Sequence, residues 1–301
     1  MTDLPRLAHD HRDPVAFDAL VVETAEDHQG TWQPNWPPGT ERRVLGRDPT
    51  TGGSTTLLTF PAGYDRSEER ELASAGHPQR FEYHSCHEEI VSVAGDYVFG
   101  DPPLYRFDAP AYLNHPPFWL HPARQRSAGG VLLLVRNSHP VDFGFCYIPP
   151  AWDGREHYLK AARLPPSPSE AVTVQHLADF PLAPIAENAV PLPGVRGERL
   201  WTDQVTGWQT WLLEAEAGST LAAGAAAPAP VARTQGPASS GDEWFILEGQ
   251  VGFGSDEPHT ILDAYGYRCD PDRYPAGGDR ATARSQTRLL RWVRGGHLQV
   301  T

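Results

Sequence analysis

Side chains that can bind a metal ion are concentrated in two segments of the first half of the chain. Glu82, His84 and Glu88 lie close together, and His121 follows later in the sequence. If the first segment enters a β-strand, Glu82 and His84 project to the same face, because alternate side chains of a strand share a side. Two imidazoles with one or two carboxylates suit non-haem Fe(II), with coordination positions left for O2 and a substrate. The same set would accept Mn or Ni, or Zn with less redox use.

An internal repeat indicates which elements position these side chains. At one constant offset, Gly52 aligns with Gly207 and Gly63 aligns with Gly218. After a slip of one residue, further matches continue along both halves, and they include Glu88-Glu89 with Asp242-Glu243, Gly95 with Gly249, and Phe99-Gly100 with Phe253-Gly254. The first offset then returns for Asp108-Ala109 with Asp263-Ala264, and for Tyr112 with Tyr267. Matches in register over most of each half predict a duplicated domain.

Each repeat is expected to be built from short β-strands. The runs 55–60 and 210–214 are rich in Leu, Thr and aromatic residues, and each ends at a glycine-containing turn. The 30 Pro and 28 Gly favour turns and short strands over long helices. Helical periodicity is weak, and its best candidate, 68–74, is short. These features predict an all-β sandwich or barrel in each half.

The repeat unit resembles the cupin superfamily, whose first motif is His-x-His, three or four residues, Glu, six residues, Gly. Here Glu82-Tyr-His84, Glu88 and Gly95 follow that spacing. The second motif is Gly, five residues, Pro-x-Gly, two residues, His, and Pro116-Pro-Phe-Trp-Leu-His121 keeps its first Pro and its His. The resemblance covers roughly 36–147 and 190–301. It implies two tandem cupin barrels (double-stranded β-helices of the jelly-roll type) with few short helices, and a metal site formed by His84, Glu88, His121 and Glu82.

The sequence departs from the cupin pattern at several positions. Glu82 stands where the first His usually lies, Phe118 replaces the Gly of the second motif, and Pro110 replaces its leading Gly. His87 and His115 are nearby substitutes for a missing imidazole. His87 falls in a turn, where exposure to solvent is the simplest expectation. Strand alternation points His115 away from Tyr112 and Asn114, which predicts a role in supporting the ligands or in packing.

The C-terminal half is expected to lack a metal. At the repeat offset His121 corresponds to Ala276, His84 corresponds to Ala238 or Ser239, and no His occurs between His176 and His259. We therefore expect one divalent ion per chain, Fe(II) with Mn, Ni and Zn as alternatives. The expected organisation is an N-terminal extension (1–35), a metal-binding cupin (36–160), a Pro-rich linker (161–190) and a degenerate cupin (191–301).

The sequence also indicates candidate residues for a substrate pocket around the expected ligands. Phe118 and Trp119 are its strongest candidates, because they replace small residues of the motif beside His121, and Tyr97 is a further aromatic candidate. Such walls would suit an aromatic or polyketide-like compound, whereas a plain barrel core would use the same residues. Arg80 and Arg124 flank the ligand segments and would receive a carboxylate or an enolate, or else remain solvated at the surface.

Three functional classes are open. The first is an Fe(II)-dependent dioxygenase that acts with O2 on a small aromatic or β-dicarbonyl compound, like the diketone-cleaving and hydroxyacetophenone-cleaving cupins. The second is a non-redox isomerase, cyclase or decarboxylase, in which Glu82 or His115 is the catalytic group that moves a proton. The third is a binding or regulatory module, because the sequence also resembles anti-sigma-factor cupin domains.

Composition excludes several other classes. The net charge is −13, and no basic block provides a nucleic-acid footprint. No apolar run approaches the roughly 18 residues of a membrane helix, and residues 1–14 lack the apolar core of a signal peptide. Cys86, Cys146 and Cys269 are expected to be reduced thiols of a cytoplasmic protein. Exposed barrel edges would favour a homodimer.

Overall fold

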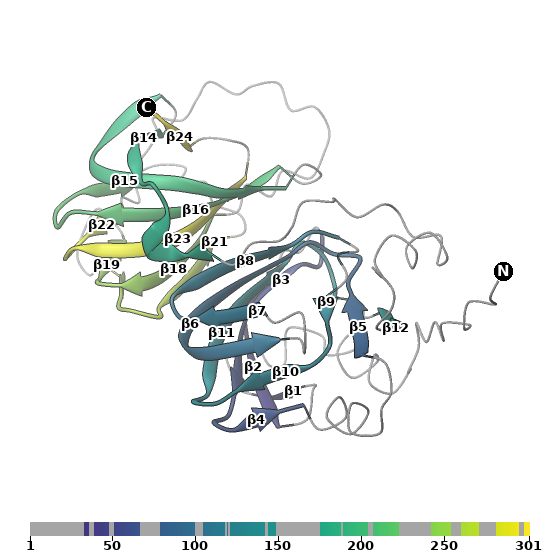
Figure 1. Cartoon of the computed structure of the whole chain (residues 1–301). Coiled ribbons are helices and arrows are strands. Elements are labelled where there is room, and N and C mark those ends of the chain that lie inside the picture. Colours follow the sequence, from purple (N-terminus) through teal and green to yellow (C-terminus); the bar gives the residue numbers. More distant parts are fainter. Residues whose placement is uncertain are drawn as a thin grey trace. The chain divides into compact units, whose positions relative to one another are not determined.

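The structure analysed is a computed structural model, in which β-strands account for nearly all regular structure of the described residues (Figure 1). The structure describes residues 33–35, 39–47, 51–66, 79–99, 105–117, 119, 121–141, 144–148, 175–187, 189–203, 207–222, 242–253, 260–270, 281–294 and 298–301. The chain divides into two compact units, Met1–Ala178 and Asp179–Thr301. The one helical element in the described ranges is the 3-10 helix η1 (Leu177–Asp179). No described helix is long and apolar enough to cross a membrane.

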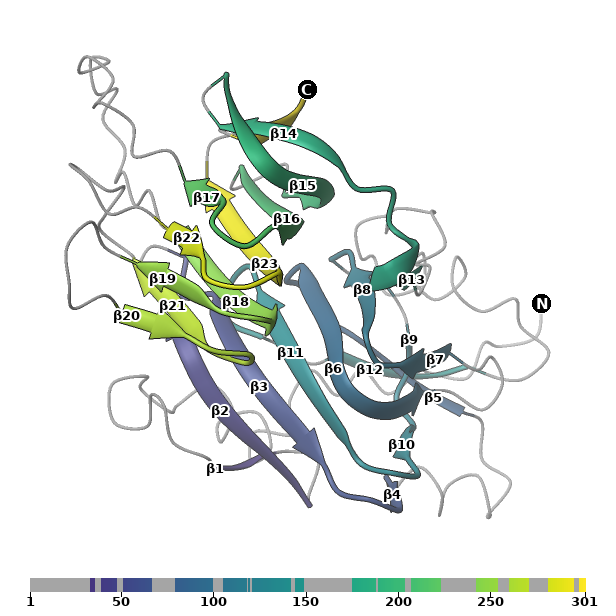
Figure 2. The same ribbon diagram turned by 90° about the vertical axis from the view of Figure 1, so that its left-hand side faces the viewer.

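The first unit contains a large antiparallel sheet and a smaller one. The large sheet has the order β1-β2-β3-β11-β6-β10-β4, with β7 and β8 also paired to β6, and β13 paired to β8. The smaller sheet has the order β12-β5-β9. Figure 2 shows β2, β3, β11 and β6 side by side. The strands are β1 (Gln33–Asn35), β2 (Thr40–Arg47), β3 (Ser54–Phe60), β4 (Tyr64–Asp65), β5 (Gln79–Tyr83), β6 (Glu88–Phe99), β7 (Tyr105–Asp108), β8 (Ala111–His115), β9 (His121–Pro122), β10 (Gln125–Ser127), β11 (Val131–Asn137), β12 (Gly144–Ile148) and β13 (Gln175–His176).

The second unit repeats the central strand order of the first. Its larger sheet has the order β21-β18-β23-β16-β15-β14-β24, so β15-β16-β23-β18-β21 corresponds to β2-β3-β11-β6-β8, and a second sheet has the order β17-β22-β19-β20. The strands are β14 (Ala183–Glu187), β15 (Val190–Thr202), β16 (Trp208–Ala215), β17 (Thr220–Ala222), β18 (Asp242–Glu248), β19 (Val251–Phe253), β20 (Thr260–Leu262), β21 (Tyr267–Asp270), β22 (Ala281–Ala283), β23 (Thr287–Arg294) and β24 (Leu298–Val300).

Backbone geometry matches the sequence repeat at the aligned glycines. Gly52 and Gly207 both have φ of 74°, and Gly95 and Gly249 have φ of 88° and 83°. Left-handed backbone of this kind favours glycine, because a Cβ atom is strained there. Gly95 and Gly249 lie beyond the slip in the alignment, so the one-residue change of offset corresponds to a real difference between the two halves.

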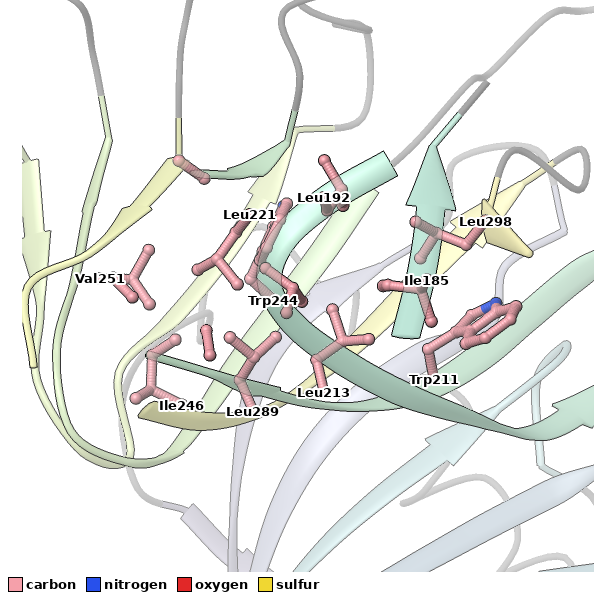
Figure 3. Packing of buried hydrophobic residues seen from close by; sticks show 14 of the residues in the cluster. Ile185, Leu192, Trp211, Leu213, Leu221, Trp244, Ile246, Val251, Leu289 and Leu298 are labelled. Atoms are coloured by element: carbon pink, nitrogen blue, oxygen red, sulfur yellow. The ribbon is translucent and has the colours of Figure 1, made fainter. Parts of the chain in front are cut away.

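Alternating side chains of the strands form the two cores. In the first unit the inward side chains of β6, β8 and β11 include Ile90, Leu113 and Val135, which belong to one buried cluster. In the second unit the core lies between the two sheets, where Trp211 and Trp244 pack among aliphatic side chains (Figure 3). Apolar surface removed from water stabilises each unit by about 25 cal/mol per Å2.

These observations confirm the expected fold class, an all-β chain of two cupin barrels. Two further expectations concern segments that lie wholly or partly outside the described residues. The candidate helix 68–74 and the part 161–174 of the expected linker lie outside them. The described rest of that linker carries β13, η1, β14 and the first residue of β15. Cys86 is a buried free thiol.

Candidate metal centre

The candidate site is built from two pairs of residues that face each other across antiparallel strands. Glu82 of β5 is directly opposite His121 of β9, and Glu88 of β6 is directly opposite His115 of β8. Directly opposed residues project to the same face of a sheet, with Cβ atoms about 4.5–5.5 Å apart. His84 follows the last residue of β5. Four of the five side chains are buried, and that of Glu88 is 13% exposed.

The donor atoms of these residues lie close together. His84 Nε2 is 3.3 Å from His121 Nε2 and 3.9 Å from Glu88 Oε2. His115 Nδ1 is 2.8 Å from Glu88 Oε2, and His121 Nδ1 is 3.7 Å from Glu82 Oε1. Among the described residues two groups have donor atoms that all lie within 4.8 Å of one another, namely Glu82, His84 and His121, and Glu88, His115 and His121.

Glu82 is also held by neighbours that the sequence did not indicate. Arg66 Nη1 donates to Glu82 Oε2 at 3.2 Å and to the Ala123 carbonyl oxygen at 2.8 Å, and the Arg66 and Glu82 side chains are only 1% and 2% exposed. Gln125 Nε2 donates to Glu82 Oε1 at 3.3 Å. Neither Arg66 nor Gln125 stands in a recognisable motif, so no signal in the sequence would have identified them.

Burial and neighbouring charges shift the pKa values of three groups in and beside the cluster, namely Glu88, His115 and Tyr97. Burial raises the pKa of the Glu88 carboxyl, but the charge of His84, the hydrogen bond and charge of His115, and the charge of His87 outweigh burial and hold this pKa below its usual value. Burial lowers the pKa of His115, against the effect of its hydrogen bond to Glu88. Burial and the charges of Glu82 and Glu88 raise the pKa of Tyr97 well above its usual value, so this phenol is neutral near pH 7.

Trp119 forms one wall of the cluster. Its ring is buried, with its centroid 4.6 Å from that of His115 and 5.5 Å from that of His121. The His115 and His121 rings stack on each other, with centroids 4.6 Å apart and planes inclined by 22°. Stacked rings have few alternative rotamers, so Trp119 restricts the orientation of both imidazoles.

The donor set suits a divalent ion. Imidazole and carboxylate donors in one buried cluster are what non-haem iron, manganese, nickel and zinc accept in proteins. The residues present therefore fit a metal ion, and the first unit contains both groups of close donors found in the described part of the chain.

The remaining predicted site residues are placed differently. Tyr97 lies on β6, buried against Phe60 and Phe107. Arg124 donates to both carboxylate oxygens of Asp65, at 3.1 and 2.9 Å, so its guanidinium is held in an ion pair. Arg80 belongs to β5, but its side chain lies outside the described residues, as does all of Phe118.

The exposure expected for His87 was wrong, whereas the direction expected for His115 agrees with the structure. His87 is buried rather than exposed, and its Nε2 lies 2.5 Å from Asn114 Oδ1. His115 does point away from Tyr112 and Asn114, but the face to which it points is the barrel interior, where it contacts Glu88 and His121 directly. Its direction is therefore as expected, and it lies close to the candidate donors Glu88 and His121.

The second unit differs from the first in one layer of paired side chains. Ala238, Ser239 and Ala276, the counterparts of the expected histidines, lie outside the described residues. One layer inward, Trp244 of β18 is directly opposite Arg268 of β21 and Arg291 of β23. In the first unit the same layer holds Leu113, Ile90 and Val135.

Two antiparallel barrels in tandem, one of them with a histidine and carboxylate cluster, define the fold of a bicupin. No protein-family model and no curated protein matches the sequence. Among solved structures, the chain is similar to a candidate dioxygenase from Nostoc punctiforme, with 13% identity over 87% of this chain and 77% of that one, at a TM-score of 0.57. It is also similar to a candidate glyoxylate-induced protein from Pseudomonas aeruginosa (11% identity, 90% and 84% covered, TM-score 0.50) and to a cupin 2 conserved barrel domain protein from Leptotrichia buccalis (8%, 85% and 89%, 0.45). At these identities the likeness to the first two structures concerns the fold alone.

Proposed function

We propose that this chain is a metal-dependent cupin enzyme, a non-haem Fe(II) dioxygenase that acts on a small aromatic or β-dicarbonyl compound. The observation that carries the proposal is the meeting of three imidazoles and two carboxylates inside the first barrel, in two groups of three that share His121 and whose donor atoms lie within 4.8 Å of one another. The fold likeness to a candidate dioxygenase agrees with the proposal, but at 13% identity it does not carry it.

His84, Glu88 and His121 would hold the ion, and a further donor would come from Glu82 or His115. Bound Fe(II) would supply Lewis-acid binding of an enolate or phenolate and a place for O2 beside it. The protein itself would contribute the negative charge that balances the ion and the positions of the donor atoms. One carboxylate, Glu82, is already balanced by the Arg66 guanidinium, so Glu88 is the carboxylate whose charge remains for the ion.

The surroundings of the cluster favour a flat organic substrate. Trp119 presents an aromatic ring beside two of the imidazoles. Aromatic walls with a few convergent polar groups are typical of sites for small organic ligands. Burial of the cluster also excludes water from the reacting groups, which strengthens electrostatic interactions inside the site.

One contact favours a second candidate, a non-redox isomerase, cyclase or decarboxylase. His115 and Glu88 form a hydrogen-bonded acid–base pair at 2.8 Å, and such a pair can carry a proton to and from a substrate carbon or oxygen. In this enzyme His115 would be the catalytic group, and the ion would polarise a carbonyl.

The two candidates differ in their need for oxygen. Protein purified without oxygen and loaded with Fe(II) is mixed with a panel of β-diketones and hydroxyaryl ketones, and O2 consumption is followed with an electrode. O2 uptake that matches substrate loss supports the dioxygenase, and turnover that persists under argon supports the non-redox enzyme. Absence of bound metal in the freshly purified and in the loaded protein would contradict both.

A further inference from the structure

We infer that His115 takes the coordination position that Glu82 leaves, so that the ion is held by His84, Glu88, His115 and His121. Glu82 is then a positioning residue that orients His121 from its Nδ1 side, while His121 binds the ion through Nε2. This assignment rests on the proposed metal binding of the first barrel. It makes the metal set one of three imidazoles and one carboxylate, in which the third imidazole comes from β8 instead of β5.

Both oxygens of Glu82 already accept hydrogen bonds. Oε2 accepts from the Arg66 guanidinium at 3.2 Å, and Oε1 accepts from the Gln125 amide at 3.3 Å. Arg66 is in turn fixed by the Ala123 carbonyl oxygen. The ion pair is almost completely buried, and removal of one partner from such a pair leaves an uncompensated charge. Glu82 is therefore anchored and neutralised by protein groups.

His121 presents a different ring nitrogen to Glu82 than to His84. His121 presents Nδ1 to Glu82 Oε1 at 3.7 Å and Nε2 to His84 Nε2 at 3.3 Å. A histidine ligand binds metal through one ring nitrogen and commonly donates its other N–H to a carboxylate, which fixes the tautomer and the ring orientation. Glu82 Oε1 lies on the Nδ1 side of His121, where such an outer carboxylate would lie, and Nε2 faces the other imidazole.

His115 stands where a fourth ligand belongs. It is the cross-strand partner of Glu88, it lies 2.8 Å from Glu88 Oε2, and it forms a close donor group with Glu88 and His121. Separations near 3 Å are those of neighbouring ligands on an ion with metal–ligand distances of about 2.0–2.2 Å.

The test compares Glu82→Gln and His115→Ala, with His176→Ala as the matched histidine control on β13. Each full-length variant is titrated with Co(II), and the visible absorption spectrum, the stoichiometry and the affinity are recorded. Glu82→Gln should keep one equivalent and the wild-type spectrum, with affinity lowered about 10–100-fold, as for the loss of an outer carboxylate. His115→Ala should lose the wild-type spectrum and retain no metal after dialysis, and His176→Ala should match the wild type.

A measurement on the unaltered chain keeps the assignment testable if a variant does not fold. Pulsed electron paramagnetic resonance of the Cu(II)-loaded wild type should count three coordinated imidazoles. Two imidazoles, a His115→Ala variant with the wild-type Co(II) spectrum, or a Glu82→Gln variant that binds no Co(II) would each overturn the assignment while the metal site stands. A wild type that binds no metal would overturn the proposed function itself, and this assignment with it.

Discussion

His115 of β8 lies opposite Glu88 of β6, and its Nδ1 is 2.8 Å from the carboxylate oxygen Oε2. A second cross-strand pair, Glu82 and His121, lies close to the first. His84 lies between Glu82 and Glu88 in the sequence. Two rungs of antiparallel pairing therefore bring together residues that are far apart along the chain. The precision of the candidate site comes from strand register, which is stiffer than loop geometry.

We expect His121→Ala to abolish metal retention while the chain still folds. His121 belongs to both groups of close donors, so its loss removes a ligand from either arrangement. Loss of outer partners alone lowers metal affinity about 10–100-fold, and loss of a direct ligand should exceed about 100-fold. Metal content is measured by elemental analysis after anaerobic purification, and folding is checked by circular dichroism.

The same measurement examines the second barrel. The wild type should contain one equivalent of metal per chain, because the counterparts of His121 and His84 are Ala276 and Ala238 or Ser239. Two equivalents in the wild type, or stoichiometric metal in His121→Ala, would contradict the expected ligands.

Trp119 should report on the occupied site through its fluorescence. Its ring lies 4.6 Å from His115 and 5.5 Å from His121, measured between centroids, so an open-shell ion bound to these imidazoles should quench its emission. The Trp119→Phe variant should lose most of the Co(II)-induced quenching that the wild type shows. Zn(II), which does not quench in this way, is the control ion. Equal Co(II) quenching in Trp119→Phe and in the wild type would place the ion elsewhere.

Much of the fold could be predicted because the repeat constrains the backbone. Aligned glycines keep the same left-handed conformation, and aligned polar pairs keep the same bond. Tyr112 donates to Glu89 at 2.6 Å, and its counterpart Tyr267 donates to Glu243 at 3.0 Å. Such pairs lie on the face of the sheet opposite to that of Ile90 and Leu113, and alternation fixes which residues can meet there.

The site was less accessible to sequence reasoning. Alternation gave the direction of His115 correctly, but it did not reveal that this face is the interior. Arg66 directly follows β4 and Gln125 begins β10, and no period or motif marks either of them. Arg124 looked available for a substrate until the structure placed Asp65 against it. Residues that meet only through tertiary contacts leave no local pattern in the sequence. Such residues form the surroundings of the candidate ligands.

Gly95→Ala should destabilise the first unit far more than Gly63→Ala. Both glycines have positive φ, 88° and 73°, but a Cβ at Gly95 would lie 1.9 Å from the Gly130 carbonyl oxygen, whereas at Gly63 nothing lies within 4 Å. We expect a loss of more than about 3 kcal/mol at Gly95, from strain and overlap, and about 1–2 kcal/mol at Gly63, from strain alone. Denaturant titrations measure both, and equal losses would show that the overlap is relieved without cost.

Asp96→Asn should make the first unit less sensitive to acid. The Asp96 carboxylate accepts from the backbone N–H groups of Ala128 and Gly129, at 2.9 and 2.6 Å, and these bonds hold its pKa below the usual value. A lowered pKa gives stability that is present above the unfolded pKa of about 3.9 and is lost as pH falls through the folded value. The variant should be less stable by about 1 kcal/mol or less at pH 7, and the difference should shrink below about pH 4. Unfolding at several pH values measures it, and a difference that is independent of pH would contradict the assigned cause.

The interior of the second barrel should depend on an ion pair where the first barrel has apolar side chains. Arg291 donates to Glu187 at 2.6 Å and to the Leu221 carbonyl oxygen at 3.2 Å, and its guanidinium lies 4.3 Å above the Trp244 ring. Both charged side chains are almost fully buried, so Glu187→Gln leaves the positive charge without compensation and should cost about 3 kcal/mol.

The double variant Glu187→Leu with Arg291→Met removes both charges, and it should be as stable as the wild type or more stable, because well-packed apolar side chains replace buried ion pairs at little cost. Thermal unfolding of both variants and of the wild type tests this. A double variant less stable than Glu187→Gln would mean that the contacts of Arg291 with Trp244 and Leu221, and not charge compensation, stabilise this interior. Metal content serves as the control, because the candidate centre lies in the other unit and both variants should retain one equivalent.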